Sequence, residues 1–499
     1  MRVWENLEPK AVFHYFEDIC NIPHGSGNVE KISNYLVDFA KEHNLEYYQD
    51  ETLNVIIIKE ATPGYEDHEP VMIQGHMDMV AVKKPDCDIN MKEEGLRIQT
   101  DGDRVYAEGT SLGGDDGIAV AYGLALLDSK EYKHPRIELV VTVDEETGMD
   151  GARAIDFAPC RAHTLLNLDS EEEGIFLAGC AGGARVNYEL NYDQNKVKGM
   201  PCKIRVAGLL GGHSGAEIHK ERGNAVCLLA RVLPELACGV TFCIESLEGG
   251  LADNAIPREA AAGILVTGYK AKDGNCRIDD QDFKESECGL LIENTIARLN
   301  KELQNELAEK DPGVLAEITL ESIGERDCMS EERSLVITSF LNTIPYGVQA
   351  MSGAMEGMVE TSLNPGILKC SQGHFHLGIS VRSSLDSAKY ALINKLKSLA
   401  HLGGISAEVT GEYPGWAYRK DSPLRDKMVQ IYEEMYHQKP EIQAIHAGLE
   451  CGLFAQKIED LDCVSLGPDM KNIHTTEEEL SISSTERVWK YLIRLLEEM

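Results

Sequence analysis

The sequence predicts an α/β fold in which a mixed, largely parallel sheet is flanked by helices and interrupted by an inserted α+β domain. Apolar runs such as 71–75 and 137–143 alternate with helical patterns such as 117–128, an alternation typical of layered α/β structures. The alternation changes near residue 187 and resumes only after about residue 401. The 499 residues also exceed what one simple core holds, so two or three domains are expected.

The first part of the chain is predicted to begin with two amphipathic helices within residues 9–43, separated by a break at 22–27 that contains proline and glycine. Short apolar runs bounded by turn residues indicate buried strands. They occur at 52–59, 71–75, 137–143 and 164–168. The small residues of 117–128 indicate a helix that packs closely on the sheet.

The middle of the chain, from about residue 187 to 400, has a different order of elements. Strands are expected near 201–207, 241–247, 259–267, 315–321, 374–382 and 405–410. Helices are expected near 221–236, 280–308, 331–342 and 386–401. This order resembles two successive β-α-β-β-α-β units that share some of their elements. It predicts an inserted α+β domain with a weak internal repeat.

The α/β pattern returns in the last hundred residues. The expected elements are helices at 423–436, 448–457 and 484–498 and a strand at 462–466. No low-complexity linker separates the parts, which favours an insertion over domains in tandem. We therefore expect one domain formed by 1–186 and 401–499, and a second formed by 187–400.

Composition restricts the classes of function. The formal net charge of −35 argues against nucleic acid or an anionic membrane as a partner. No run of about 18 apolar residues is present, so no membrane span is expected, and the first residues lack the apolar core of a signal peptide. The fourteen cysteines include no C-x-x-C pair, which fits reduced thiols. A cytoplasmic protein is expected.

Polar clusters follow the predicted strands where ligand sites of parallel sheets gather. Amide hydrolysis is served by two divalent ions about 3.5–4 Å apart, which require one shared carboxylate and a further histidine and carboxylate for each ion. The residues that supply this set are His76, Asp115, Glu146, Asp169 and His474. Mixed histidine and carboxylate ligands suit zinc, and also cobalt or manganese.

Two further carboxylates have separate expected roles. Glu145, beside the ligand Glu146, is placed to take a proton from the attacking water and pass it to the leaving nitrogen. Asp78 lies two residues after His76, on the same side of an extended chain, and is expected to orient the imidazole. Each residue taken alone has an ordinary explanation as a surface or capping residue, so the prediction depends on the combination.

Five motifs together resemble the aminoacyl-histidine dipeptidases of the co-catalytic zinc aminoacylase/carboxypeptidase clan. They are Gly-His-Met-Asp-Met-Val, Thr-Ser-Leu-Gly-Gly-Asp-Asp-Gly-Ile, Asp-Glu-Glu-Thr-Gly-Met-x-Gly-Ala, Asn-Leu-Asp-Ser-Glu-Glu-Glu-Gly and the late Asn-Ile-His. The similarity runs from about residue 5 to the C-terminus. It implies a catalytic domain of the zinc-exopeptidase type with an inserted lid domain.

The resemblance also implies a role for each ligand. Asp115 would bridge both ions, His76 and Asp169 would complete one site, and Glu146 and His474 would complete the other. Glu145 would be the general base and Asp78 the orienting carboxylate. Relatives usually have a cis peptide after the bridging aspartate, here Asp115–Asp116, and often have asparagine where this chain has Asp116. We expect no change of chemistry from that difference.

Substrate residues are expected mainly in the inserted domain. By the resemblance, His213 in Gly-His-Ser-Gly stabilises the oxyanion, while its ordinary explanation is a loop histidine that caps a helix. Arg382 is the candidate for the substrate carboxylate, with Asn254 beside it. Gly448 would allow close backbone approach, and Glu450 would bind the free amino group. His219 and Cys451 are expected to be structural.

The predicted activity is metal-dependent hydrolysis of Xaa-His and related dipeptides such as β-alanyl-histidine. A tripeptide aminopeptidase, a carboxypeptidase and an N-acyl amino acid deacylase of the same clan are the alternatives. A binding protein that kept the fold without catalysis would lack a ligand or the base, and none is missing. A homodimer is possible, because His213 would act either within its own chain or from a partner subunit.

Overall fold

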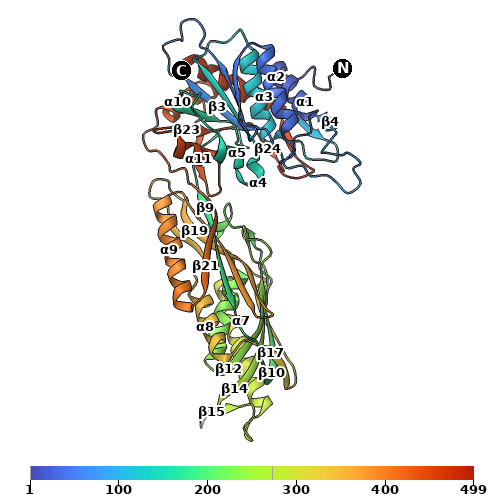
Figure 1. The fold of residues 1–499 in the computed structure, drawn as a ribbon, viewed down its shortest axis with the longest axis vertical. Coiled ribbons are helices and arrows are strands. Elements are labelled where there is room, and N and C mark those ends of the chain that lie inside the picture. The colour runs from blue at the N-terminus through green and yellow to red at the C-terminus, as the bar shows by residue number, and fades with distance from the viewer. Residues whose placement is uncertain (1, 272–273) are drawn as a thin grey trace. The chain divides into compact units, whose positions relative to one another are not determined.

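The computed structural model describes residues 2–271 and 274–499. Contacts divide the chain into two compact units, each with its own core (Figure 1). Unit 1 comprises the described residues up to Cys180, together with Trp416–Ala444 and Leu449–Met499, and unit 2 comprises Ala181–Gly415 and Ile445–Gly448. The sequence pattern predicts domain boundaries near residues 186 and 400. It gives no sign that residues 445–448 belong to unit 2. None of the described helices has the length and apolar character needed to span a membrane.

Unit 1 is built on an eight-stranded sheet with strand order β1-β2-β6-β3-β7-β23-β8-β22. The strands are β1 Glu46–Gln49, β2 Val55–Lys59, β3 Val71–His76, β6 Ile137–Thr142, β7 Thr164–Asn167, β8 Ile175–Cys180, β22 Glu441–Ile445 and β23 Asp462–Ser465. The four central strands β6, β3, β7 and β23 are parallel. The β1–β2, β2–β6 and β23–β8 pairs are antiparallel. The predicted mixed sheet is confirmed, with its parallel part at the centre.

Eight helices accompany this sheet in the described part of unit 1. They are α1 Lys10–Cys20, α2 Glu30–Glu42, α3 Gly114–Asp128, α4 Glu145–Gly148, α5 Asp150–Ala154, α10 Pro423–Tyr436, α11 Glu450–Lys457 and α12 Ile482–Glu498. Five of them (α1, α2, α3, α10 and α12) share one hydrophobic core with the sheet. A four-stranded sheet of order β24-β25-β5-β4 stands beside them. Its strands are β4 Ile98–Asp101, β5 Arg104–Ala107, β24 Met470–Lys471 and β25 Glu479–Ser481.

Helix α3 brings part of the predicted site against the central sheet. Every residue of α3 from Gly114 to Leu127 is buried, and the helix packs on β3 and α1. A Cβ at Gly75 of β3 would lie 2.5 Å from the Cβ of Ala119 and 2.5 Å from Asp116 Oδ2. Glycine at this position therefore permits the close approach of α3 to β3 that the small residues of the helix predict.

Unit 2 contains an eleven-stranded sheet whose main path runs β16-β10-β14-β12-β19-β20-β9-β21. Three further strands join it: β15 pairs with β14, β17 with β10 and β18 with β19. The strands are β9 Gly182–Asn191, β10 Asn195–Ala207, β12 Val240–Gly249, β14 Ala260–Ala271, β15 Gly274–Arg277, β16 Leu315–Leu320, β17 Gly324–Cys328, β18 Gly347–Met351, β19 Val359–Ser371, β20 His374–Ser383 and β21 Ser406–Tyr413. The pairs whose register is defined are all antiparallel.

Four helices form a layer along this sheet, with α7 against α6, α6 against α8, and α8 against α9 (Figure 1). They are α6 Ala225–Ala237, α7 Glu285–Glu306, α8 Glu331–Thr343 and α9 Asp386–Gly403. The predicted α+β insert is thus present, as one continuous sheet. Strand β19 was not predicted because Pro365 and Gly366 interrupt its pattern. The structure accommodates them at a register shift between Pro365 and Ile367.

Candidate metal centre

The predicted metal-site side chains all lie at the ends of elements or in the loops that join them in unit 1. They are His76 at the end of β3, Asp115 at the start of α3, Glu145 and Glu146 at the start of α4, Asp169 just after β7, and His474 between β24 and β25. Strands β3, β6 and β7 are parallel neighbours, so their carboxyl ends lie at one edge of the sheet.

Asp115 is the centre of the cluster. Its Oδ1 lies 3.1 Å from His76 Nε2 and its Oδ2 lies 3.1 Å from His474 Nε2. His474 Nε2 also lies 2.8 Å from Glu146 Oε1, and His76 Nε2 lies 3.9 Å from Asp169 Oδ1. The five predicted ligands therefore converge, with the two oxygens of one carboxylate each facing a different histidine.

The donor set fits divalent metal ions. Three overlapping groups each place ligand atoms within 4.8 Å of one another: His76, Asp116 and Asp169; His76, Glu145 and Glu146; and Asp115, Glu146 and His474. Imidazole nitrogens mixed with carboxylate oxygens suit zinc, cobalt or manganese. Asp116 is an addition to the predicted set. It is fully buried, and its Oδ2 accepts a hydrogen bond from the backbone N–H of His76. The Asp115–Asp116 peptide bond is cis, as the resemblance implied.

The charges of the cluster are strongly coupled. Burial alone would lower the pKa of His76, but its bonds to Asp115 and Asp78 outweigh burial and hold that pKa well above its ordinary value. Hydrogen bonds to Asp115 and Glu146 raise the pKa of His474 to about 10. Burial would raise the pKa of Asp115, yet the two histidines hold it well below its usual range. These opposite shifts reflect attraction between the two histidines and the carboxylates around them.

Asp78 connects a ligand to the predicted base. Its Oδ1 lies 3.5 Å from His76 Nδ1 and accepts the backbone N–H of Glu145 at 3.1 Å, while its Oδ2 accepts the hydroxyl of Ser26 at 2.8 Å. The backbone carbonyl of Asp78 accepts the closer bond from His76 Nδ1, at 2.9 Å. With Nδ1 engaged, His76 Nε2 is the nitrogen that can ligate a metal. Ser26 was not predicted, and only its place in the glycine-containing break at 22–27 could have suggested it.

Glu145 is half-buried beside the cluster. Burial raises its pKa to about 7, and the neighbouring carboxylates Glu146 and Asp115 contribute to the increase. A carboxyl group with a pKa near neutrality can both accept and release a proton at physiological pH. The role of Glu145 as general base stays a prediction.

Glu450 lies in the buried layer beneath the ligands rather than at the surface. It is fully buried, and its Oε2 accepts hydrogen bonds from Gln74 Nε2 and Thr142 Oγ1. Burial raises its pKa to about 8. Its assignment to the substrate's amino group stays a prediction.

The remaining predicted substrate residues belong to unit 2. His213 Nδ1 accepts backbone N–H groups from Gly215 and Ala216 at 3.2 and 3.0 Å, so the proton of the neutral ring is on Nε2. Arg382 is 9% exposed and donates from Nη1 to the Tyr413 hydroxyl at 3.0 Å. A Cβ at Gly215 would meet both His213 and Arg382, so these two side chains share one part of unit 2.

The other predicted positions of unit 2 are the loop residue Asn254 and the chain segment around Gly448. Asn254 is exposed, and its carbonyl accepts the backbone N–H of Ser214. Gly448 is half-buried just before α11. His446, which the sequence analysis did not select, is buried and its Nε2 is 2.7 Å from the hydroxyl of Ser362. Its place in the sequence, two residues before Gly448, is the feature that could have identified His446 as a candidate.

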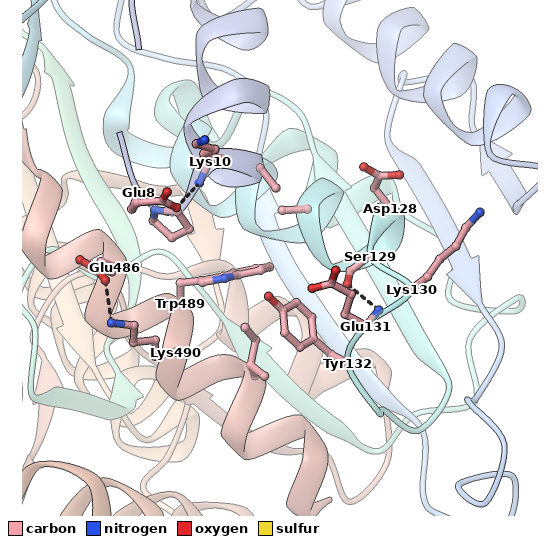
Figure 2. A pocket seen from close by; sticks show the side chains of 14 residues that line it. Glu8, Lys10, Asp128, Ser129, Lys130, Glu131, Tyr132, Glu486, Trp489 and Lys490 are labelled. Carbon is pink, nitrogen blue, oxygen red and sulfur yellow. Dashed lines mark hydrogen bonds and ion pairs between the residues drawn. The ribbon is translucent and has the colours of Figure 1, made fainter. Parts of the chain in front are cut away.

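Unit 1 also has a surface hollow of about 840 Å³ that none of the predicted site residues lines (Figure 2). Its walls carry Lys10, Asp128, Tyr132 and Trp489, among others. Glu486 and Lys490 at its edge pair with each other. None of the candidate metal groups found among the described residues lies in this hollow.

Comparison with known proteins decides the family. The sequence model of Peptidase family M20/M25/M40 matches residues 72–498, which is most of the chain. The chain belongs to this family. It is therefore a hydrolase of the metallopeptidase class, as predicted.

Two full-length relatives of this M20 peptidase are dipeptidases by name. The cytosol non-specific dipeptidase of Escherichia coli (strain K12) is 35% identical over 495 residues, which cover 99% of this chain and 98% of the relative. The crystal structure of aminoacylhistidine dipeptidase from Vibrio alginolyticus is 34% identical and matches with a TM-score of 0.87, over 99% of this chain and 98% of that one. These findings confirm the predicted resemblance and the predicted fold.

A more distant structure shares only the fold. Aminopeptidase PepT from Bacillus cereus is 16% identical and matches with a TM-score of 0.55 over 99% of both chains.

Proposed function

We propose that this M20 peptidase hydrolyses dipeptides, with Xaa-His dipeptides such as β-alanyl-histidine as its preferred class, at two divalent metal ions. The observation that carries the proposal is Asp115, whose two carboxylate oxygens each face a different ligand histidine, with Glu145 beside them. Two relatives matched over their full length, a non-specific dipeptidase and an aminoacylhistidine dipeptidase, support the substrate class.

In this proposal Asp115 would be shared by both ions. His76 and Asp169 would hold one ion, and Glu146 and His474 would hold the other. Zinc suits the donor set best, with cobalt or manganese as alternatives. When bound, such ions polarise the scissile carbonyl and lower the pKa of water. Asp78 fixes both the ring of His76 and the backbone of Glu145.

Glu145 carries the proton transfers. Its carboxylate accepts a proton from the attacking water, and the resulting carboxylic acid gives that proton to the nitrogen of the departing amine. Its place beside the candidate ligands, with its backbone N–H bound by Asp78, supports this role. One residue thus serves as base and then as acid.

Unit 2 is proposed to act as a lid that supplies the substrate contacts. His213 would donate its Nε2–H to the oxyanion, and the tautomer fixed by the Gly215 and Ala216 amides supports that role. Arg382 would bind the substrate carboxylate, Asn254 would bind the substrate carbonyl or carboxylate, and Gly448 would permit close backbone approach. His213 acts either within its own chain or across a homodimer. A cytoplasmic location is proposed, since the Escherichia coli relative is named a cytosol enzyme.

A substrate panel tests this proposal. We expect a higher kcat/KM for β-alanyl-histidine and other dipeptides than for tripeptides, N-acyl amino acids or longer carboxypeptidase substrates, measured with the purified full-length chain. Activity should disappear after chelation and return on addition of zinc or manganese. A preference for tripeptides or acyl amino acids would assign one of the alternative activities. Activity that survives complete removal of metal would contradict the metal mechanism.

A further inference from the structure

Glu478 is a buried carboxylate near the metal centre that has no role in the proposed reaction. It lies four residues after the ligand His474 and directly before β25, and it is 3% exposed. Burial of a carboxylate is costly unless its oxygens accept hydrogen bonds. The partners of Glu478 therefore indicate what it holds.

The carboxylate of Glu478 accepts hydrogen bonds from four consecutive backbone N–H groups of one loop. Its Oε2 accepts from Leu112 and Gly113 at 2.7 and 3.0 Å, and its Oε1 accepts from Gly114 and Asp115 at 2.8 and 3.4 Å. The first N–H groups of a helix have no partner within the helix. Glu478 thus satisfies the amide groups at the start of α3.

The fit between this carboxylate and the loop is close. A Cβ at Gly114 would lie 3.3 Å from Glu478 Oε1, and Gly113 has a left-handed φ of 70°. The loop therefore has the two glycines it needs to present its amides to one side chain. Charge-assisted bonds of this kind are roughly twice as strong as neutral ones.

The loop and the C-terminal segment each carry a metal ligand. Asp115 is the last of the four donors, and His474 lies on the connection between β24 and β25 that also carries Glu478. The two ligand side chains lie 3.1 Å apart. Through the four amides, one carboxylate ties the backbone of the shared ligand to the segment that supplies the last ligand.

We propose that Glu478 is a positioning residue for the metal centre, setting Asp115 against His474 through the backbone amides of residues 112–115. The inference rests on the proposed metal function. It predicts that Glu478, whose carboxylate binds backbone amides, affects metal affinity as well as local stability. Outer-shell partners of metal ligands typically contribute about 10–100-fold in affinity or activity.

The test compares Glu478→Gln with the control Glu479→Gln. Glutamine has the same shape, but its NH₂ group would face two of the loop amides in place of an acceptor. Glu479 is the adjacent residue and pairs with Arg104 at the surface. Zn²⁺ and Mn²⁺ are titrated into the metal-free proteins well below their unfolding temperatures, and kcat and KM are measured at saturating metal.

We expect Glu478→Gln to bind metal about 10–100-fold more weakly and to lose kcat with KM little changed, while Glu479→Gln behaves as the wild type. A lower unfolding temperature with wild-type metal affinity would show a purely structural role and overturn the proposal. If Glu478→Gln does not fold, the test uses Glu478→Asp, which keeps the charge on a shorter side chain. Wild-type metal affinity of Glu478→Asp would also overturn the proposal. A wild-type chain that binds metal yet cleaves no dipeptide would contradict the proposed function alone.

Discussion

Glu145→Gln is expected to lower kcat by about 10²–10⁴-fold while the protein keeps its metal. Glutamine preserves the size of the side chain and leaves the ligand Glu146 and the Asp78 bond to the backbone of residue 145 in place. It cannot accept the proton of the attacking water. The measurement pairs kcat for β-alanyl-histidine with metal content by elemental analysis.

Glu172→Gln is the matched control, since Glu172 is an exposed glutamate on the loop after β7. It should retain wild-type turnover. Substantial hydrolysis by Glu145→Gln with full metal content would remove Glu145 from the role of general base. Loss of metal together with turnover would instead make Glu145 a ligand, which its place in one of the three candidate groups allows.

Asp115→Ala is expected to remove metal binding at both sites and to reduce hydrolysis to background. Its two oxygens are each 3.1 Å from a different ligand histidine, so one substitution removes the ligand shared by both ions. Metal content and dipeptide hydrolysis are measured on the same preparation, with circular dichroism to confirm folding.

Asp150→Ala serves as control, because Asp150 is an exposed aspartate at the start of α5. It should bind metal and turn over substrate as the wild type does. Retention of one full equivalent of metal by a folded Asp115→Ala would contradict the bridging role. That result would favour Asp116, which shares a candidate group with His76 and Asp169, as the carboxylate of the remaining site.

The sequence could predict that the candidate ligands converge, because parallel strands bring their carboxyl ends to one edge of a sheet. His76, Glu146 and Asp169 follow three strands that are neighbours in the sheet, and each strand was recognisable as a short apolar run. His474 was found from its motif, although it is almost 360 residues from Asp115 in the sequence. The family resemblance assigned the pairing of ligands, which periodicity alone leaves open.

Other features have no local sequence signal. Glu478 and Ser26 act through bonds to backbone amides and to another carboxylate, and such contacts exist only after the chain has folded. The hydrogen bonds of the buried Glu450 to Gln74 and Thr142 also have no local sequence signal. Strand β19 was missed because Pro365 disfavours a strand until a neighbouring bulge accommodates it.

The most direct test of the account is anomalous diffraction from a crystal of the chain grown with zinc or manganese. We predict two peaks about 3.5–4 Å apart, both contacting Asp115, with His76 and Asp169 on one ion and Glu146 and His474 on the other. A single peak, or two peaks that share no ligand, would contradict the two-metal centre.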